Sequence, residues 1–271
     1  MRKLSDVRFP REEEVESLKA LWHISFGDDY DYIDEFFERA FNKENTLVIS
    51  DGDKVVSALY LIEGYIVKDE KIYNAYYVYA VATLPSYRGK GLMASLLRMA
   101  DDVATKRNVS YLFLVPGEES LYEMYKKFGY GKGFYFKEKV VEKKNLSYEC
   151  EKSDMNYDLY LNCRREYPLN ETVVFCEDGY NIFVSPRGED VKSIYVENVG
   201  YCVYEKMSDG VTVWELFGDE DILLNEVFKL SKADTVRLRK FTSQGGIPCG
   251  MYKAFGDAPK IESAFIGAYG G

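Results

Sequence analysis

The stretch Tyr79–Ala94, YAVATLPSYRGKGLMA, decides the fold of the first half of the chain. The residues leading into it, Ile72–Ala82, are rich in tyrosine and valine, which favours a strand. Apolar residues at helical spacing follow in Leu92–Arg107 and predict a helix. Gly89 and Gly91 lie between the two elements and predict a tight turn. A strand that turns directly into a helix is typical of an α/β sheet.

The residues before this stretch predict helices followed by antiparallel strands. Asp51-Gly52 is a strong signal for a hairpin turn, because aspartate and glycine both tolerate the backbone angles that such turns require. The expected elements are two helices, Glu12–Phe26 and Tyr32–Phe41, and three strands, Thr46–Ser50, Lys54–Glu63 and Gly64–Val67.

The residues after it continue the alternation of strands and helices. Ile72–Ala82 and Val109–Val115 should be parallel, since a single right-handed helical crossover joins them. The predicted fold class is therefore a mixed α/β sheet. The expected elements are strand Val109–Val115, helix Leu121–Phe128 and strand Phe134–Val141.

A second, smaller α/β unit is expected after the charged run Glu142–Asn145, which gives domains 1–143 and 146–271. Its strand and helix order resembles the middle of the first half. Gly218-Asp219-Glu220-Asp221 stands where the first half has Arg88–Gly91, and its carboxylates would repel an anion. The expected elements are helix Asp154–Glu166, a helix within Glu171–Phe183, strands Ser193–Val196, Gly200–Lys206 and Val211–Phe217, helix Asp219–Ala233, and closing strands Thr235–Phe241 and Pro248–Ala254.

Composition excludes several classes of protein. The net charge of −10 argues against nucleic acid as a partner, and suits either a cationic substrate or a solvated acidic surface. Five cysteines without CxxC spacing are expected to be reduced thiols, with no metal site. The single histidine, His23, makes a hydrolase triad improbable. The sequence has no long apolar run and no signal peptide, so we expect a cytoplasmic protein without a membrane partner.

The turn at Arg88–Gly91 has the chemistry of an anion site. Backbone N–H groups at the start of a helix converge on one point, where the helix dipole also favours negative charge. Gly89 and Gly91 allow positive φ and a close approach of phosphate, and Arg88 and Lys90 add positive charge. A plain strand-to-helix turn, with glycines for geometry alone, is the alternative.

The same segment resembles the coenzyme A loop of the GNAT acetyltransferases, Arg/Gln-x-x-Gly-x-Gly/Ala. Arg88 and Gly91 match the pattern, and Met93 stands where the family has a small residue. VATLPSYRGKGLM is particularly similar to the Eis-like branch. The resemblance covers about residues 1–143. It implies a GNAT domain followed by a GNAT-like second domain that does not bind coenzyme, and no sterol-carrier-like third domain is expected.

A second signature agrees with the first. Met124–Gly131 is similar to the family's Tyr-x-x-x-Gly-Phe/Tyr ending, which puts Tyr125 at the general acid that protonates the departing thiolate. Without the resemblance, Tyr125 would be an ordinary aromatic residue of an amphipathic helix. The resemblance further implies that acetyl-CoA is held by Val81, Ala82, Thr83, Arg88, Gly89, Lys90, Gly91, Leu92, Met93 and Ser120.

The acceptor site and the general base stay open at this stage. Asp28 and Asp29 could hold an ammonium group, or could cap the helix that follows them. Tyr76, Tyr77 and Tyr79 either line the acceptor cleft or pack the sheet. The candidate bases are Glu118, Glu119, the carboxylate of Gly271, which the resemblance suggests, and a water molecule.

These observations predict transfer of the acetyl group of acetyl-CoA to a primary amine, on a small molecule or a protein. A non-catalytic coenzyme A sensor is the alternative, because Met93 departs from the loop pattern and the strand Tyr76–Tyr79 lacks the glutamate of many GNATs. A third hypothesis is that the second half is a surface for protein interaction, including self-association, which would give a homo-oligomer.

Overall fold

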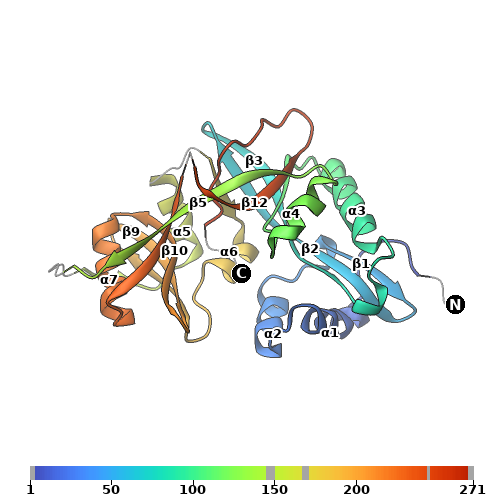
Figure 1. Cartoon of the computed structure of the whole chain (residues 1–271), viewed down its shortest axis with the longest axis horizontal. Helices are drawn as coiled ribbons and strands as arrows, with labels where there is room; N and C mark the ends of the chain where they lie inside the picture. Colours follow the sequence, from blue (N-terminus) through green and yellow to red (C-terminus); the bar gives the residue numbers. More distant parts are fainter. Residues whose placement is uncertain (1–3, 145–149, 167–170, 243–244, 268–271) are drawn as a thin grey trace. The chain divides into compact units, whose positions relative to one another are not determined.

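The computed structural model describes residues 4–144, 150–166, 171–242 and 245–267. The chain forms two compact units (Figure 1). The first comprises Met1–Ile66, Ile72–Lys132 and Met251–Lys260, and the second comprises Val67–Lys71, Gly133–Gly250 and Ile261–Gly271. Each unit contains helices and a mixed or antiparallel sheet, which confirms the predicted α/β class. Among the described residues, no helix is long and apolar enough to cross a membrane.

The first unit follows the predicted order of helices and strands. Figure 1 shows α1 and α2 together on one side of β1 and β2. Within this unit the strands neighbour one another in the order β1-β2-β3-β4-β12. The elements are α1 Val15–Phe26, α2 Tyr30–Arg39, β1 Thr46–Asp51, β2 Lys54–Lys68, β3 Lys71–Thr83, α3 Leu92–Lys106, β4 Tyr111–Leu114, α4 Glu119–Lys126 and the end of β12 Ile247–Ala254.

The pairing in this sheet confirms the crossover predicted from the sequence. β1 and β2 are antiparallel across the Asp51-Gly52 turn. β3 and β4 are parallel, with register from Ala75↔Tyr111 to Tyr77↔Phe113. The amphipathic helix α3 joins them and buries Leu96 and Ala100 completely.

One predicted break in the sheet is wrong. β2 runs without interruption from Lys54 to Lys68, whereas the sequence predicted separate strands on either side of Gly64. Ile62, Gly64 and Ile66 alternate with more exposed neighbours and are all buried. Burial of this one face keeps the strand continuous through the glycine. The turn between β2 and β3 lies at Asp69 and Glu70, which both have positive φ, within the polar segment Lys68–Lys71 that the sequence predicted as a turn.

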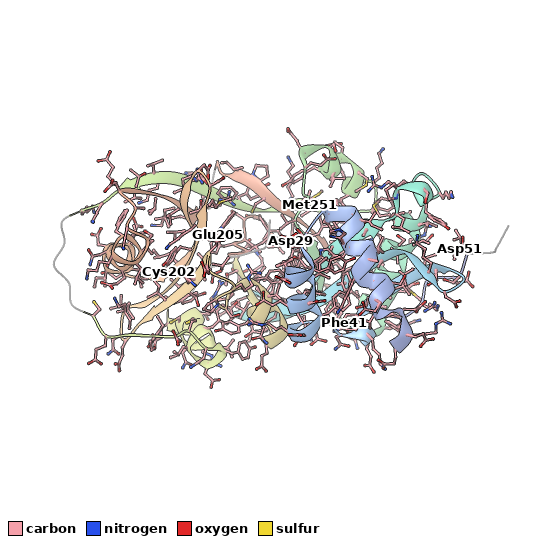
Figure 2. All side chains as sticks on the ribbon, turned by 90° about the horizontal axis from the view of Figure 1, so that it is seen from below. Asp29, Phe41, Asp51, Cys202, Glu205 and Met251 are labelled. Carbon is pink, nitrogen blue, oxygen red and sulfur yellow. The ribbon has the colours of Figure 1, made fainter. Side chains whose placement is uncertain are left out.

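The second unit contains helices and strands of its own. Its strands neighbour one another in the order β5-β11-β10-β9-β8-β6. Cys202 and Glu205, labelled in Figure 2, lie on its strand β9. The elements are β5 Gly131–Glu142, β6 Lys152–Ser153, α5 Tyr157–Glu166, β7 Glu171–Phe175, α6 Glu177–Phe183, β8 Val191–Val196, β9 Gly200–Met207, β10 Gly210–Gly218, α7 Glu220–Ser231 and β11 Thr235–Phe241.

The helix expected within Glu171–Phe183 is only partly correct. Its first part is the strand β7, and only α6 is helical. The strand forms because a distant segment supplies its partners: Val173 N donates to Phe265 O at 2.9 Å, and Phe265 N donates to Glu171 O at 3.0 Å. The helix prediction is therefore wrong for Glu171–Phe175, because hydrogen bonds to a segment about ninety residues later in the chain make these residues a strand.

The strand Pro248–Ala254, predicted to close the second unit, belongs to that unit only up to Gly250, and its end from Met251 belongs to the first unit. Met251–Ala254 pairs antiparallel with β4, from Met251↔Leu114 to Ala254↔Tyr111. Met251 (labelled in Figure 2) is 2% exposed and Tyr252 is 7% exposed. The domain boundaries at 143 and 146 stay a prediction, but the two compact units do not correspond to two unbroken lengths of chain.

A buried carboxylate anchors the N-terminal segment to the first unit. The Glu14 side chain is 1% exposed. It accepts hydrogen bonds from both terminal nitrogens of Arg8 at 2.7 Å, from Arg11 N at 2.8 Å and from Ser50 Oγ at 2.9 Å. Burial alone would raise the pKa of Glu14, but these hydrogen bonds outweigh it and lower the pKa to about 2.

Glu14→Gln is expected to lower the free energy of unfolding at pH 7 by about 2–3 kcal/mol, since hydrogen bonds to a charged group are lost. Because folding lowers the pKa of Glu14, its contribution is present above about pH 4.5 and is lost as the pH falls through about 2. Urea unfolding from pH 7 to pH 2 should show the difference from wild type shrinking in that window. Glu16→Gln, at an 84% exposed side chain, is the control and should unfold like wild type. A difference that does not depend on pH would contradict this account.

Candidate active site

The loop between β3 and α3 has the geometry of an anion cradle. β3 ends at Thr83, a short 3-10 turn covers Pro85–Tyr87, and α3 begins at Leu92. Gly89 and Gly91 have φ values of 75° and 77°, which glycine alone adopts without strain. A Cβ at either position would meet no atom within 4 Å, so the space over the loop is open.

The backbone N–H groups of this loop are available to a ligand. The first N–H that bonds into the helix is that of Ser95, which donates to Gly91 O at 3.1 Å. Over the described ranges, no backbone acceptor pairs with the N–H groups from Gly89 to Ala94. Gly91 is the N-cap and supplies no side chain that could take their place. These groups fit a pyrophosphate, which accepts several hydrogen bonds and carries the charge that a helix N-terminus favours.

The two basic side chains of the loop also lie where the sequence predicted. Arg88 Nε donates to Thr83 O at 3.1 Å, which holds the loop against the end of β3. Lys90 Nζ lies 4.5 Å from the centre of the Tyr87 ring. Both residues are exposed, so their charge adds to the attraction for an anion without being buried. Leu92 is buried in the first turn of α3 and Met93 is half-buried there.

Strands β3 and β4 part beside the loop. Their register ends at Tyr77↔Phe113, although β3 continues to Thr83. Ala80 has a φ of 45°, an unusual value for a residue with a side chain, and marks an irregularity in the strand. On the other side, Ser57 Oγ donates to Ala82 O at 2.8 Å. Ala82 is thus held from β2, and among the described residues the β3/β4 register does not extend to Val81–Thr83. The coenzyme role of this backbone stays a prediction.

Tyr125 lies near the C-terminal end of α4 and is 7% exposed. Its ring packs edge-on against that of Tyr130, with the ring centroids 5.8 Å apart. Burial raises the pKa of Tyr125 to about 12. The hydroxyl is therefore protonated at neutral pH and can donate a proton.

Ser120, Glu118 and Glu119 lie at the other end of α4, and all three are exposed. Ser120 Oγ donates to Glu118 Oε1 at 2.6 Å. Within the described part of the chain, no hydrogen bond or ion pair links these residues to the Arg88–Gly91 loop. Their coenzyme and base roles stay predictions, and Gly271, the third candidate for the base, lies outside the described residues.

The two acceptor-site aspartates behave differently. Asp28 Oδ2 accepts a hydrogen bond from Trp22 Nε1 at 2.7 Å, so this carboxylate is oriented from α1. Asp29, labelled in Figure 2, is the N-cap of α2, but its side chain makes no capping hydrogen bond. Its backbone oxygen accepts from Ile33 N at 3.1 Å. The Asp29 carboxylate therefore does not cap α2, which was the alternative role predicted for it. This carboxylate is exposed.

The three tyrosines of β3 that the sequence analysis considered differ in burial. Tyr76 and Tyr77 are buried and pack the sheet, and Tyr77 stacks on Phe113 with centroids 5.1 Å apart. Tyr79 is half-buried, and its hydroxyl lies 2.9 Å from the hydroxyl of Tyr32 on α2.

Sequence reasoning missed Tyr32 and the aromatic cluster beside it. The indole of Trp22 contacts the rings of Phe36, Tyr60 and Tyr79 at centroid distances of 4.7, 5.3 and 5.6 Å. The aromatic spacing of α2 was visible in the sequence, but periodicity shows only that one face is apolar, not which strand it meets. The cluster joins α1, α2, β2 and β3.

The corresponding loop of the second unit is filled by its own carboxylates. The Asp219 side chain accepts a hydrogen bond from Ile222 N at 3.0 Å, which satisfies the start of α7. Lys139 and Lys240 both donate to Glu220. These contacts support the prediction that this loop does not bind coenzyme.

Comparison with known proteins agrees with this geometry. Residues 6–133 match the model of the acetyltransferase (GNAT) domain. A GCN5-related N-acetyltransferase from Kribbella flavida is similar in structure, with 16% identity and a TM-score of 0.72 over 93% of this chain and 71% of its own. Eis1 from Mycobacterium abscessus is similar with 11% identity and a TM-score of 0.67, over 93% and 73%.

Saccharomyces cerevisiae N-myristoyltransferase with bound myristoyl-CoA is also similar, with 9% identity and a TM-score of 0.60 over 92% of this chain and 81% of its own. At these identities the three likenesses show the fold alone. Comparison with the curated proteins gives no match. The matched residues include the whole of the Arg88–Gly91 loop and Tyr125. The chain therefore contains a GNAT acetyltransferase domain, the fold of acyl-CoA-dependent N-acyltransferases.

Proposed function

We propose that the protein is an N-acetyltransferase that moves the acetyl group of acetyl-CoA directly to a primary amine of a small molecule or a protein. The observation that carries this is the combination of an open loop with unpaired N–H groups and the split between β3 and β4 next to it. The loop can hold the pyrophosphate while the split exposes backbone groups to the reacting end.

The binding roles follow from the available groups. The N–H groups from Gly89 to Ala94 would hold the pyrophosphate, with Arg88 and Lys90 adding charge. The backbone of Val81–Thr83 would hold the pantetheine and orient the thioester. Acetyl-CoA supplies an activated acyl group when bound. A donor N–H placed beside the thioester carbonyl stabilises the negative charge that develops on its oxygen, commonly by about 3 kcal/mol.

Tyr125 is proposed as the general acid that donates its proton to the sulfur as the thiolate leaves. Burial keeps this hydroxyl protonated across the physiological range, because the pKa is raised to about 12. The acid is therefore lost only as the pH rises through about 12. Loss of activity at high pH below that value would have to come from another group.

Two features support a short acyl group and a cationic acceptor. The stacked rings of Tyr77 and Phe113 lie where the strands part, and large buried rings there leave little room for a long chain. The Asp28 carboxylate lies beside the aromatic cluster because it accepts from Trp22, and the next carboxylate, Asp29, is exposed. This pair suits an amine that carries a positive charge before transfer. The base that removes its proton would be a carboxylate or a water molecule.

Tyr125→Phe is expected to lower kcat by about 100-fold, since a positioned general acid contributes at least that much. The affinity for acetyl-CoA should stay within about twofold of wild type, because the ring is retained. Turnover is measured as free thiol released in the presence of a panel of amines, and affinity by calorimetry. Tyr122→Phe, on the same helix, is the matched control and should turn over like wild type.

The two measurements separate the alternatives. Binding without turnover by wild type against any amine would favour the non-catalytic sensor. Unchanged turnover in Tyr125→Phe would remove Tyr125 from the mechanism. Faster turnover with a long-chain acyl-CoA than with acetyl-CoA would overturn the assignment of the acyl group.

A further inference from the structure

Three residues from separate parts of the chain meet behind Tyr125. They are Lys253 of β12, Asp101 of α3 and Tyr130, which follows α4. We call this cluster the α3–α4 brace. All of its residues belong to the first unit.

Lys253 links the two helices directly. Its Nζ donates to Asp101 Oδ2 at 2.6 Å and to Phe128 O, just beyond the end of α4, at 3.0 Å. Its stem runs along Gly129, where an added Cβ would lie 3.3 Å from Lys253 Cε. Gly129 also has a φ of 90°, so both its backbone angle and the lysine stem favour glycine here.

Tyr130 extends the cluster to Tyr125. The Tyr130 hydroxyl is buried, and neither it nor Asp101 Oδ1 has a hydrogen-bond partner among the described residues. Burial raises the pKa of Tyr130, and the negative charge of Asp101 raises it further. Tyr130 N donates to Tyr125 O at 3.3 Å, in addition to the ring contact.

The helix that carries Tyr125 needs such an anchor. α4 has 8 residues, and a helix of this length is not stable on its own. The turn that follows the helix bonds its last carbonyl groups, since Lys127 N, Phe128 N and Gly129 N donate to Met124 O, Tyr125 O and Lys126 O. The Lys253 cation bonds Phe128 O in this turn and interacts favourably with the C-terminal end of the helix dipole. α3 begins at the coenzyme loop. The ion pair between Lys253 and Asp101 of α3 therefore fixes the end of α4 relative to that loop.

We propose that Lys253 is a positioning residue for Tyr125: by joining Asp101 of α3 to the end of α4, it holds the Tyr125 hydroxyl at a fixed place relative to the coenzyme loop. The inference rests on the proposed function in one respect, the role of Tyr125 as general acid. On this proposal, Lys253 of β12, late in the described chain, supports a site whose other residues come from the first half of the sequence.

The kinetic test compares Lys253→Met with Lys126→Met. Lys126 is on α4, its side chain is 68% exposed, and the same substitution there should leave turnover unchanged. Lys253→Met should lower kcat about tenfold while the calorimetric Kd for acetyl-CoA stays within twofold. Asp101→Asn should have a similar but smaller effect. The double variant should be no slower than Lys253→Met, because both changes break one ion pair.

A second test reports on Tyr125 without any turnover. 3-Fluorotyrosine is placed at position 125 alone, and the ¹⁹F spectrum is followed as the pH is raised. With Lys253 present we expect one narrow resonance that titrates late; in Lys253→Met it should shift, broaden and titrate at lower pH. Asp101→Asn serves in the same way if Lys253→Met does not fold.

The two tests distinguish failure of the positioning role from failure of the proposed general acid. Identical ¹⁹F titrations with and without Lys253 would overturn the positioning role, whatever the kinetics show. A changed titration together with full activity in Tyr125→Phe would keep the brace and reject the proposed general acid.

Discussion

Gly91→Trp is expected to weaken the binding of acetyl-CoA by about a thousandfold. Gly91 has a φ of 77°, which a residue with a side chain adopts only with strain, and its Cβ direction leads into the open space over the loop. A Trp there would occupy the position of the phosphates and tilt the N–H groups from Gly89 to Ala94. Loss of two charge-assisted hydrogen bonds at about 2 kcal/mol each gives a factor of this size.

Calorimetric titration with acetyl-CoA measures this effect. Gly256→Trp is the matched control, because Gly256 also has positive φ (57°) and open space at its Cβ but lies beyond β12, away from the loop. The control should bind like wild type. Unchanged binding by Gly91→Trp would show that coenzyme is held elsewhere, and no binding by wild type would mean that Met93 has closed the loop.

A fragment ending at residue 133 is expected to be unfolded, although it contains the whole segment that matches the family model. β4 is completely buried, and β12 covers one of its edges with Met251 and Tyr252. Removing two large buried side chains costs about 2–3 kcal/mol each, and four backbone pairings are lost as well. This approaches the whole stability of a typical domain, about 5–15 kcal/mol.

Circular dichroism and sedimentation of the fragment measure its folding. The matched variant carries residues 247–260 at the end of the fragment, joined through a flexible glycine-serine linker. It should regain secondary structure, cooperative melting and coenzyme binding. A fragment that melts cooperatively without the added strand would contradict the account of β12.

The sequence predicted best where the deciding signals are local. The glycines at 89 and 91 and the helical spacing after Leu92 lie within one short stretch, and the structure places the loop and α3 as they require. The partner of a strand is not a local property. Nothing in the sequence near β4 indicates that Met251 lies beside it, and nothing near Glu171 indicates Phe265.

The candidate site divides in the same way. The coenzyme loop follows from backbone chemistry, but Tyr125 could be singled out only by resemblance, because burial and a raised pKa do not appear in a sequence. Lys253 has no signal at all, since a lysine in a strand usually faces solvent. Tyr32 belongs to a visible aromatic stripe, but its contact with Tyr79 depends on how α2 packs.

Because β12 lies late in the chain, the first unit cannot complete its folding until most of the chain has been synthesised. β4 emerges from the ribosome more than a hundred residues before the strand that covers it. At about 5–20 residues per second, its apolar edge stays uncovered for about 7–27 s. An uncovered hydrophobic edge is a template for aggregation. The nascent first unit is therefore a natural client for a chaperone, and its release into an active form has to wait until the second unit has been made.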